Sequence, residues 1–324
     1  MDEIKWGIIG AGDVTEKKSG PALYKIDHSK LVAVMRRDAE KVKDYAKRHN
    51  VARYYTDADQ LINDQEVNIV YVATPPESHK EYTIKALNAG KPVYVEKPMA
   101  MNYSECLEMV AASQITNQKL FVAYYRRALP YFLKVKELLD SNVIGDILSV
   151  DVRFFRSASD SDKDKNRQSW RLKREVAGEG YFFDLAPHTL DILDFLLGEI
   201  EDAKGYSQNL GHYYDVADTI SAILQFKSGV VGSGLWNFTA PSLAQEDSIT
   251  IVGTGGKILF NTFAFKPIYL LTQKGEEYFV TEHPEHIQQP LIQTIVDELR
   301  GVGICPSTGV TGMRTSRIMD LIFS

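Results

Sequence analysis

The sequence predicts two domains of different class: an α/β domain with a parallel sheet over residues 1–123, and an α+β domain with a mostly antiparallel sheet over residues 124–324. In the first third of the chain, apolar strand-like segments alternate with helical ones, which is typical of βαβ units. After residue 123, strand-like segments cluster with turns between them, and helices are segregated from them. A chain of 324 residues is long enough for two domains of ordinary size.

Five short apolar segments of the first domain are predicted as strands: residues 4–9, 31–35, 69–73, 91–95 and 120–123. Three helices are expected between them, at residues 38–48, 78–88 and 103–116. Asp38 is placed to cap the first of these helices, and Gly90 is placed to end the second.

The second domain is expected to begin with a helix at residues 131–140 and a long alternating strand at 147–155. Five further strands follow at residues 219–226, 230–238, 248–252, 257–260 and 268–271. A Lys-Ser-Gly turn between Phe226 and Val230 predicts a hairpin. Helices at residues 289–300 and 309–323 are expected near the end.

Composition excludes several classes of function. Lys and Arg number 37 against 43 Asp and Glu, and the net charge of −6 argues against nucleic acid or an anionic membrane as partner. No apolar run approaches the roughly 20 residues of a membrane span, and the first residues do not resemble a signal peptide. Cys106 and Cys305 lack CxxC partners, so we expect reduced thiols, no metal site and a cytoplasmic location.

A glycine turn follows the first strand. Gly10 and Gly12 match the first two glycines of a dinucleotide-binding fingerprint, and Thr15 stands at the third position. Phosphate would bind the backbone amides where the following helix begins, at Asp13 and Val14. A plain tight turn is the alternative.

The end of the second strand indicates which nucleotide binds. A carboxylate there would favour the ribose diol of NAD, but this chain has Arg36 and Arg37. Guanidinium groups suit a 2′-phosphate and stack on adenine, so we predict NADP, with NAD as the lesser possibility. Two solvated surface arginines are the alternative.

The tripeptide Glu96-Lys97-Pro98 ends the strand at residues 91–95. A residue before proline is disfavoured in the α region, so Lys97 is expected at the carboxyl edge of the sheet, where ligands bind in open α/β folds. A solvated pair of turn charges is the alternative.

Asp184 and His188 are four residues apart on a segment that leads into a helix ending at Gly198, with Pro187 expected in its first turn. A carboxylate that orients a histidine is a common general-base arrangement. Alternatively, Asp184 caps the helix and His188 is a core residue. Trp170 and Arg171 precede this segment and are candidates to cover a nicotinamide or hold substrate, or are a core and a surface residue.

Together these motifs resemble the glucose-fructose oxidoreductase / inositol dehydrogenase / MocA family over nearly the whole chain. The resemblance implies an N-terminal Rossmann domain, a C-terminal domain on a mostly antiparallel sheet, and a homodimer or homotetramer formed through that sheet. Two positions depart from the family's pattern: Thr15, and Glu179, which interrupts a glycine run.

The resemblance also implies site roles. Lys97, Asp184 and His188 match the lysine, aspartate and histidine that the family uses on polyols and sugars. Tyr125 and Arg126 are candidate substrate contacts near the domain junction. Cofactor-binding roles would fall to Gly10, Gly12, Arg36, Arg37, Thr74, Pro75, Pro76, His79, Glu96 and Lys97.

The function expected from these roles is hydride transfer between a nicotinamide and a secondary alcohol or carbonyl of a sugar, cyclitol or related polyol. It requires Lys97 to face His188 across a crevice that holds the dinucleotide. Two alternatives stay open: a glycosidase or eliminating enzyme that retains its cofactor, and a non-catalytic cofactor-sensing regulator. The polar segment at residues 157–166 is either a lid or simply mobile.

Overall fold

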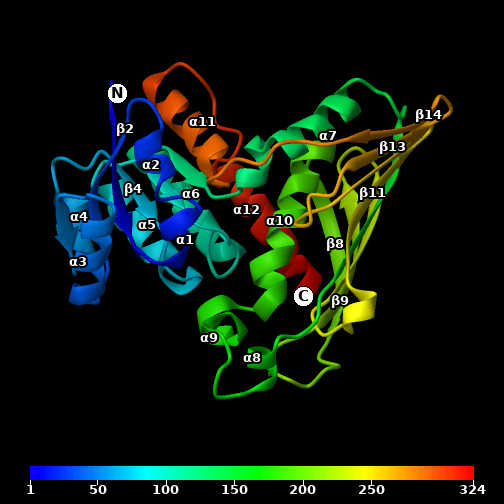
Figure 1. Cartoon of the computed structure of the whole chain (residues 1–324), viewed down its shortest axis with the longest axis horizontal. Helices are drawn as coiled ribbons and strands as arrows, with labels where there is room; N and C mark the ends of the chain where they lie inside the picture. Colours follow the sequence, from blue (N-terminus) through cyan, green and yellow to red (C-terminus); the bar gives the residue numbers. More distant parts are fainter. The chain divides into compact units, whose positions relative to one another are not determined.

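The computed structural model describes all residues, 1–324, as two compact units (Figure 1). Unit 1 comprises Met1–Leu129 and Pro284–Met313, and unit 2 comprises Pro130–His283 and Arg314–Ser324. The sequence predicted one domain boundary, at residue 123, and did not predict that the chain returns to unit 1 at Pro284. The return has a physical cause, because α11 (Gln289–Arg300) buries its apolar face against elements of unit 1.

Unit 1 is built on a six-stranded parallel sheet with the order β3-β2-β1-β4-β5-β6. The strands are β1 (Ile4–Ile9), β2 (Ser29–Met35), β3 (Arg53–Tyr55), β4 (Ile69–Val72), β5 (Val93–Val95) and β6 (Leu120–Val122). The three strands β4, β5 and β6 are buried at every position, as expected for a sheet covered on both faces. The predicted parallel sheet is therefore confirmed, and β3 is an addition to it.

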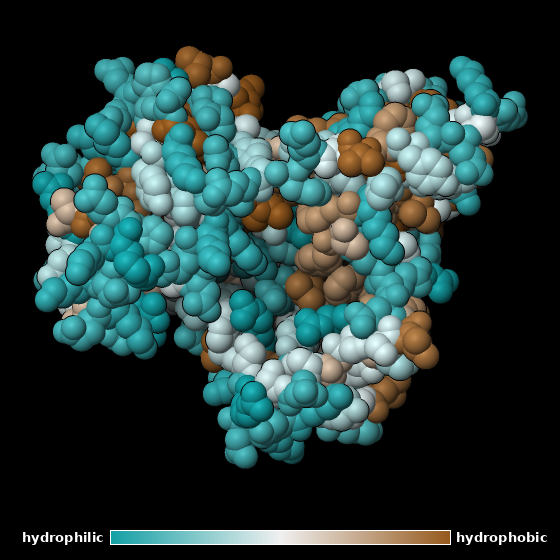
Figure 2. Space-filling model, in the orientation of Figure 1, coloured by the Kyte–Doolittle hydropathy of each residue, from teal (hydrophilic) through white to brown (hydrophobic).

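The helices of unit 1 are α1 (Asp13–Lys17), α2 (Ala22–Lys25), α3 (Ala39–Arg48), α4 (Ala58–Asn63), α5 (His79–Asn88), α6 (Tyr103–Thr116) and α11. Asp38 caps α3 by accepting a hydrogen bond from the backbone N–H of Lys41, as predicted. The surface over α3 and α4 is mainly hydrophilic (Figure 2). Gly20 and Pro21 separate α1 from α2; a Cβ atom on Gly20 would lie 2.0 Å from the carbonyl oxygen of Thr15.

Unit 2 contains an eight-stranded sheet with the order β14-β13-β12-β11-β7-β10-β9-β8. Only the central pair β7 and β10 is parallel, so the mostly antiparallel prediction is confirmed. The strands are β7 (Ile147–Phe155), β8 (Ile200–Gln208), β9 (Thr219–Phe226), β10 (Val231–Asn237), β11 (Glu246–Gly253), β12 (Gly256–Phe260), β13 (Ile268–Thr272) and β14 (Gly275–Phe279). Burial alternates along β9, which shows that one face of the sheet is covered and the other is open.

The long helix of unit 2 is α10 (Gly180–Leu197), which packs on α7 (Pro130–Asp140). Phe182 of α10 contacts Trp236 of β10, and both rings are fully buried in the core; Phe182 also contacts the half-buried Phe323 of α12 (Gly309–Phe323). The short helices α8 (Asp160–Lys163) and α9 (Arg174–Ala177) precede α10. None of the helices in the structure combines the length and the apolar character needed to cross a membrane.

Pro187 was expected in the first turn of its helix, and this prediction is wrong. Because α10 begins at Gly180, Pro187 lies inside the helix. Gly180 has a φ of +63°, a conformation that glycine adopts without strain, and it lets the helix start directly after Glu179. Asp184 is therefore an interior residue of α10 and not its cap.

Candidate functional site

The glycine turn connects β1 to α1 and runs against the segment that follows β4. The backbone N–H groups of Gly10 and Ala11 both donate to the carbonyl of Met35, at 2.9 and 3.1 Å. Gly10 has a φ of +94°, and a Cβ atom there would lie 2.8 Å from Thr74 Cγ2 and 2.9 Å from the Ala73 carbonyl. The fold itself therefore requires glycine at position 10.

Gly12 presents the opposite case. Its φ of −161° is an extended conformation open to any residue, and a Cβ atom would meet no atom nearer than 3.7 Å. Neither strain nor packing within the chain explains glycine here. In a dinucleotide-binding turn the second glycine lets a pyrophosphate approach the backbone, so this empty space fits a dinucleotide.

Thr15, at the third position of the fingerprint, is fully buried and supports the turn through hydrogen bonds. Its hydroxyl donates to the Gly12 carbonyl at 2.8 Å and accepts from the Gly12 N–H at 3.0 Å. The Tyr45 hydroxyl donates to the Thr15 carbonyl at 2.9 Å. A third glycine would serve close packing at this position. Thr15 instead caps the start of α1.

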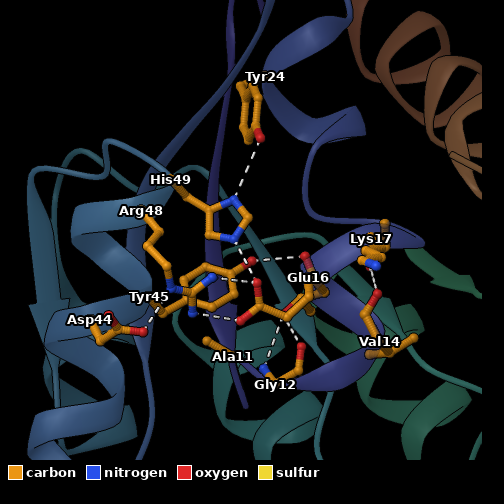
Figure 3. Close-up of polar contacts among 12 residues, drawn as sticks. Ala11, Gly12, Val14, Glu16, Lys17, Tyr24, Asp44, Tyr45, Arg48 and His49 are labelled. Atoms are coloured by element: carbon orange, nitrogen blue, oxygen red, sulfur yellow. Dashed lines mark hydrogen bonds and ion pairs between the residues drawn. The ribbon is translucent and has the colours of Figure 1, made fainter. Parts of the chain in front are cut away.

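An ionic cluster joins α1 to the end of α3 (Figure 3). The guanidinium of Arg48 donates two hydrogen bonds to Glu16, at 2.7 and 2.8 Å, and His49 Nε2 lies 3.0 Å from the same carboxylate. The hydrogen bonds from Arg48 lower the pKa of Glu16 to about 2. The His49 ring stacks on Tyr45 with centroids 4.1 Å apart. Since α1 has only five residues, these bonds are what fix it in place.

The two arginines after β2 differ in their surroundings. Arg36 is half-buried, and its guanidinium donates to the Ala11 carbonyl at 3.1 Å, so it braces the glycine turn. Arg37 is exposed. Asp13 and Val14 form the first turn of α1 beside them.

The segment Thr74-Pro75-Pro76 follows β4, and His79 follows it at the start of α5. His79 is fully buried, with its ring nitrogens 2.7 Å from the Thr74 carbonyl oxygen and 2.9 Å from the Pro98 carbonyl oxygen. Burial lowers the pKa of His79. His79 therefore joins the loop after β4 to the loop after β5.

Glu96-Lys97-Pro98 stands at the carboxyl end of β5, as the sequence indicates, and the Lys97–Pro98 peptide is cis. Glu96 is buried and accepts hydrogen bonds from the Tyr71 hydroxyl at 2.6 Å and from Gln288 Nε2 at 2.7 Å. The alternative of a solvated turn charge pair is wrong for Glu96. Tyr71 and Gln288 were missed, because Gln288 lies 192 residues from Glu96 and no local pattern joins them.

Tyr125 and Arg126 belong to the 3₁₀ helix η2 (Tyr125–Ala128) of unit 1 and are both buried. The Arg126 guanidinium lies 5.0 Å from the centroid of the Tyr125 ring, a cation–π distance.

In unit 2 the structure brings Trp170, Arg171 and Asp184 together. Arg171 Nε donates to Asp184 Oδ2 at 3.1 Å, and its guanidinium lies 4.6 Å from the centroid of the Trp170 ring. Asp184 and His188 share a face of α10 by their spacing. Glu179 precedes α10 and pairs with Arg174; burial raises its pKa.

His188 packs against the loop after β12. Its ring lies edge-on to Phe263, with centroids 5.7 Å apart, and the neighbouring Thr189 hydroxyl is 3.0 Å from that of Thr262. The Asp247 carboxylate orders this loop by accepting from three consecutive backbone N–H groups at 2.7–2.9 Å, those of residues 262–264. Asp247 is, after Tyr71 and Gln288, a third residue that the sequence patterns did not indicate.

Two further acidic residues of α10 contact α12. The Asp194 carboxylate pairs with Arg314 at 2.6 Å, and Asp191 lies 3.4 Å from the Thr315 hydroxyl. Both carboxylates are buried, so these contacts belong to the packing of α10 on α12.

The segment at residues 157–166 is anchored. It contains α8, which Ser159 caps, and the buried Asp162 accepts a hydrogen bond of 2.5 Å from the Tyr181 hydroxyl of α10. Arg156 lies 3.7 Å from the same carboxylate. The segment is therefore tied to α10 through Asp162.

Solved structures share the fold over almost the whole chain. An aldose-aldose oxidoreductase from Caulobacter crescentus has a TM-score of 0.87 at 22% identity, covering 99% of this chain and 96% of that chain. A levoglucosan dehydrogenase complexed with NADH and levoglucosan has the same TM-score and coverage at 23% identity. At these identities the likeness concerns the fold.

Sequence relatives are closer. Oxidoreductase P35 of Formosa agariphila is 43% identical over 98% of both chains. A 1,5-anhydro-D-fructose reductase of Ensifer adhaerens is 27% identical over 95% of this chain and 92% of its own. A trans-1,2-dihydrobenzene-1,2-diol dehydrogenase of Bos taurus is 29% identical over 84% of this chain and 78% of its own.

Two family models match successive parts of the chain. Residues 4–124 match the oxidoreductase family with an NAD-binding Rossmann fold, and residues 132–259 match the GFO/IDH/MocA C-terminal domain. With the 43% identity of the Formosa protein, these matches show that the chain belongs to the GFO/IDH/MocA family of oxidoreductases.

Proposed function

We propose that this protein is an NADP-dependent dehydrogenase or reductase that acts on a secondary alcohol or carbonyl of a sugar, cyclitol or related polyol. The observation that carries the proposal is the arrangement of one sheet edge in unit 1. The neighbouring strands β1, β4 and β5 end in the glycine turn, in Thr74-Pro75-Pro76 and in Lys97 respectively. Ligands bind at this edge in open α/β sheets.

The residues of unit 1 fit a dinucleotide. The open space at Gly12 suits the close approach of a pyrophosphate, with the backbone of Asp13 and Val14 beside it. The exposed guanidinium of Arg37, next to Arg36, suits a 2′-phosphate and supports NADP over NAD. When bound, the nicotinamide would exchange a hydride with the substrate carbon.

Lys97 supplies the positive charge in this proposal. Its ammonium would hydrogen-bond the substrate oxygen and stabilise the negative charge that develops there during oxidation, which is usually the largest contribution to catalysis. The neighbouring loops of Thr74 and Pro98, which His79 joins, would line the nicotinamide end.

His188 is the proposed general base. It would accept the hydroxyl proton while the hydride leaves the same carbon, a role worth about 10²- to 10⁴-fold in rate. Asp184, held by Arg171, would orient a neighbouring hydroxyl or the His188 ring. Trp170, stacked on Arg171, supplies an apolar surface near these groups. The proposal requires Lys97 of unit 1 and His188 of unit 2 to act on one substrate molecule.

The names of relatives support the substrate class. A reductase of 1,5-anhydro-D-fructose and a dehydrogenase of a cyclic vicinal diol both act on a carbon that bears oxygen in a ring. Each is less than 30% identical to this chain, so these names support the class of substrate proposed for this protein but not a particular compound.

We also propose self-association through the open face of the sheet in unit 2. Apolar side chains remain exposed on this face, with Tyr206 at 85%, Ile223 at 62% and Val231 at 52% exposure. A second copy of the chain is the partner that the family's architecture implies, as a homodimer or homotetramer.

A substrate screen tests the proposed activity. Sugars, cyclitols and their keto forms are incubated with the protein and either NADP or NAD, in both directions, and absorbance at the nicotinamide band is followed. The proposal expects net change of the cofactor in proportion to substrate, with a lower Michaelis constant for NADP. Turnover of a glycoside without net cofactor change, or no turnover across the set, would count against it.

A further inference from the structure

The carboxylate of Glu96 is held from the inside of unit 1 by groups that lie far apart in the sequence. Oε1 accepts from the Tyr71 hydroxyl at 2.6 Å and from Gln288 Nε2 at 2.7 Å, while Oε2 lies 3.2 Å from the backbone N of Lys97. Glu96 is only 6% exposed. A buried carboxylate is costly unless hydrogen bonds satisfy its oxygens, and these donors satisfy them.

Gln288 is itself fixed in one orientation. It is 1% exposed, and its Oε1 lies 2.7 Å from the Tyr94 hydroxyl. The opposite amide orientation would turn a carbonyl toward the Glu96 carboxylate and an N–H₂ group toward Tyr94, losing the charge-assisted hydrogen bond. Gln288 stands at the N-terminus of α11, where its carbonyl accepts from Ile292.

The phenols around this carboxylate remain protonated donors. Burial, and next to it the charge of Glu96, raise the pKa of both Tyr71 and Tyr94 well above the usual value. Three titratable groups interact electrostatically with Glu96 from the surrounding elements: Tyr71, Tyr94 and His79.

We propose that Gln288 is a positioning residue for Lys97. By holding Oε1 of the Glu96 carboxylate, it orients Oε2, which receives the backbone N–H of Lys97. A ring nitrogen of His79 lies within hydrogen-bond distance of the next carbonyl along the chain, that of Pro98. The inference rests on the proposed function, in which the ammonium of Lys97 must be placed accurately on a substrate oxygen. It explains why residues 284–313 pack with unit 1: the return brings a side chain that completes the Lys97 loop.

The variant Gln288→Glu tests the inference with little change of shape. It places two carboxyl groups in hydrogen-bond contact, and such a pair shares one proton and has one raised pKa. While the proton is held, the new carboxyl can donate as the amide did. The network is therefore expected to survive at acid pH and to fail as the pH rises through the raised pKa.

Three properties are measured in Gln288→Glu, in wild type and in a matched control. The control is Gln289→Glu, which makes the same change one residue along the chain. Competitive acetylation with peptide mass spectrometry reports the reactivity of Lys97 relative to other lysines between pH 6 and 9. The melting temperature is measured over the same range. Where a substrate is known, kcat and the dissociation constant of NADPH are compared.

The inference expects the relative reactivity of Lys97 in Gln288→Glu to depart from wild type increasingly as the pH rises, and the melting temperature to fall in parallel. At pH 8, kcat should be about 10- to 100-fold lower, the range that a displacement of roughly 1 Å produces, while NADPH affinity changes little. Gln289→Glu should match wild type. If Gln288→Glu behaves as Gln289→Glu does in all three measurements, the inference is overturned.

Tyr94→Phe keeps the test open should Gln288→Glu fold poorly. It removes only the hydroxyl bonded to Gln288, and the ring contacts with Trp6 and Tyr71 remain. A smaller change of Lys97 reactivity in the same direction is expected, and no change would contradict the inference. The two proposals can fail separately. If Lys97 reactivity changes in these variants but the wild-type protein oxidises no alcohol, the role of Gln288 stands and the proposed function is wrong.

Discussion

At the scale of single residues, Gly10 and Gly12 allow the cofactor site and the fold to be tested separately. A methyl group at position 12 meets open space in the protein, but it would occupy the place of a pyrophosphate. Gly12→Ala is therefore expected to keep the wild-type melting temperature and to bind NADPH at least about tenfold more weakly, a loss of roughly 1.4 kcal/mol.

Gly10→Ala serves as the contrast. It places a Cβ atom at a φ of +94° and within 2.9 Å of the Ala73 backbone, so it should lower the melting temperature as well as the affinity. Differential scanning fluorimetry and titration of NADPH fluorescence measure both quantities. If Gly12→Ala lowered the melting temperature as much as Gly10→Ala does, the fold itself, and not a bound pyrophosphate, would require glycine at position 12.

The two arginines after β2 are expected to act differently on nucleotide choice. Hydrogen bonds to a charged group contribute about 1.5–3 kcal/mol, so Arg37→Asp should weaken NADPH binding about 10- to 100-fold and leave NADH binding nearly unchanged. Arg36→Ala should weaken both nucleotides, because Arg36 also holds the Ala11 carbonyl in the glycine turn.

Lys43→Asp, an exposed change on α3, controls for the general effect of charge. Dissociation constants from nucleotide titrations provide the comparison. A wild-type preference for NADH, or an Arg37→Asp variant that loses NADH and NADPH equally, would refute the assignment of Arg37 to a 2′-phosphate.

At the scale of elements, α1 depends on its tie to α3. The folded-state pKa of Glu16 is about 2, below its ordinary value of 4.5. Because the pKa is lowered by folding, the stabilisation is fully present above about pH 4.5 and is lost as the pH falls toward 2.

Glu16→Gln should therefore lower the melting temperature by a few degrees at pH 7, with a gap to wild type that closes between pH 4.5 and 2. The control Asp44→Asn removes a carboxylate that pairs with Arg48 within α3 and leaves the tie to α1 intact. Thermal scans across this pH range make the comparison. A gap that does not depend on pH would mean that the Glu16 charge contributes nothing to holding α1.

The elements that sequence patterns predict well are those with strong local signals. The Asp38 cap of α3 and the Lys-Ser-Gly turn before β10 depend only on neighbouring residues, and both are found as predicted. The additional strands have weaker patterns: β3 and β14 are mainly exposed, and β8 is largely polar. Pro187 was misjudged because a proline normally marks a helix start, whereas Gly180 begins α10 earlier.

The placement of the candidate site residues in the fold was predictable where a motif marks the end of an element. The glycine turn follows β1, Lys97 follows β5 and His188 lies on a helix, as expected, whereas Asp184 lies inside α10 and not before it. The partners that orient them were not predictable, because they come from distant segments. Gln288, which directly precedes α11, reaches Glu96, and Arg171 reaches Asp184 from a short 3₁₀ helix at Trp170–Leu172.

At the scale of the whole molecule, the open face of the unit 2 sheet should determine the oligomeric state. In a twofold-symmetric interface one substitution acts twice, so Ile223→Lys is expected to weaken self-association by about 100-fold or more. Leu210→Lys is a matched control, since Leu210 is also 62% exposed but lies in a loop. Sedimentation velocity would show a smaller species for Ile223→Lys alone; an unchanged mass would exclude this face as the interface.

The central claim is that Lys97 and His188, which belong to different units, act in one chemical step on an alcohol. The most direct measurement is single-turnover hydride transfer in wild type, Lys97→Met and His188→Ala, with NADPH dissociation constants determined in parallel. The account predicts that each variant slows the step by at least about 10²-fold while NADPH affinity stays within about threefold of wild type. Near-normal rates in both variants would contradict it.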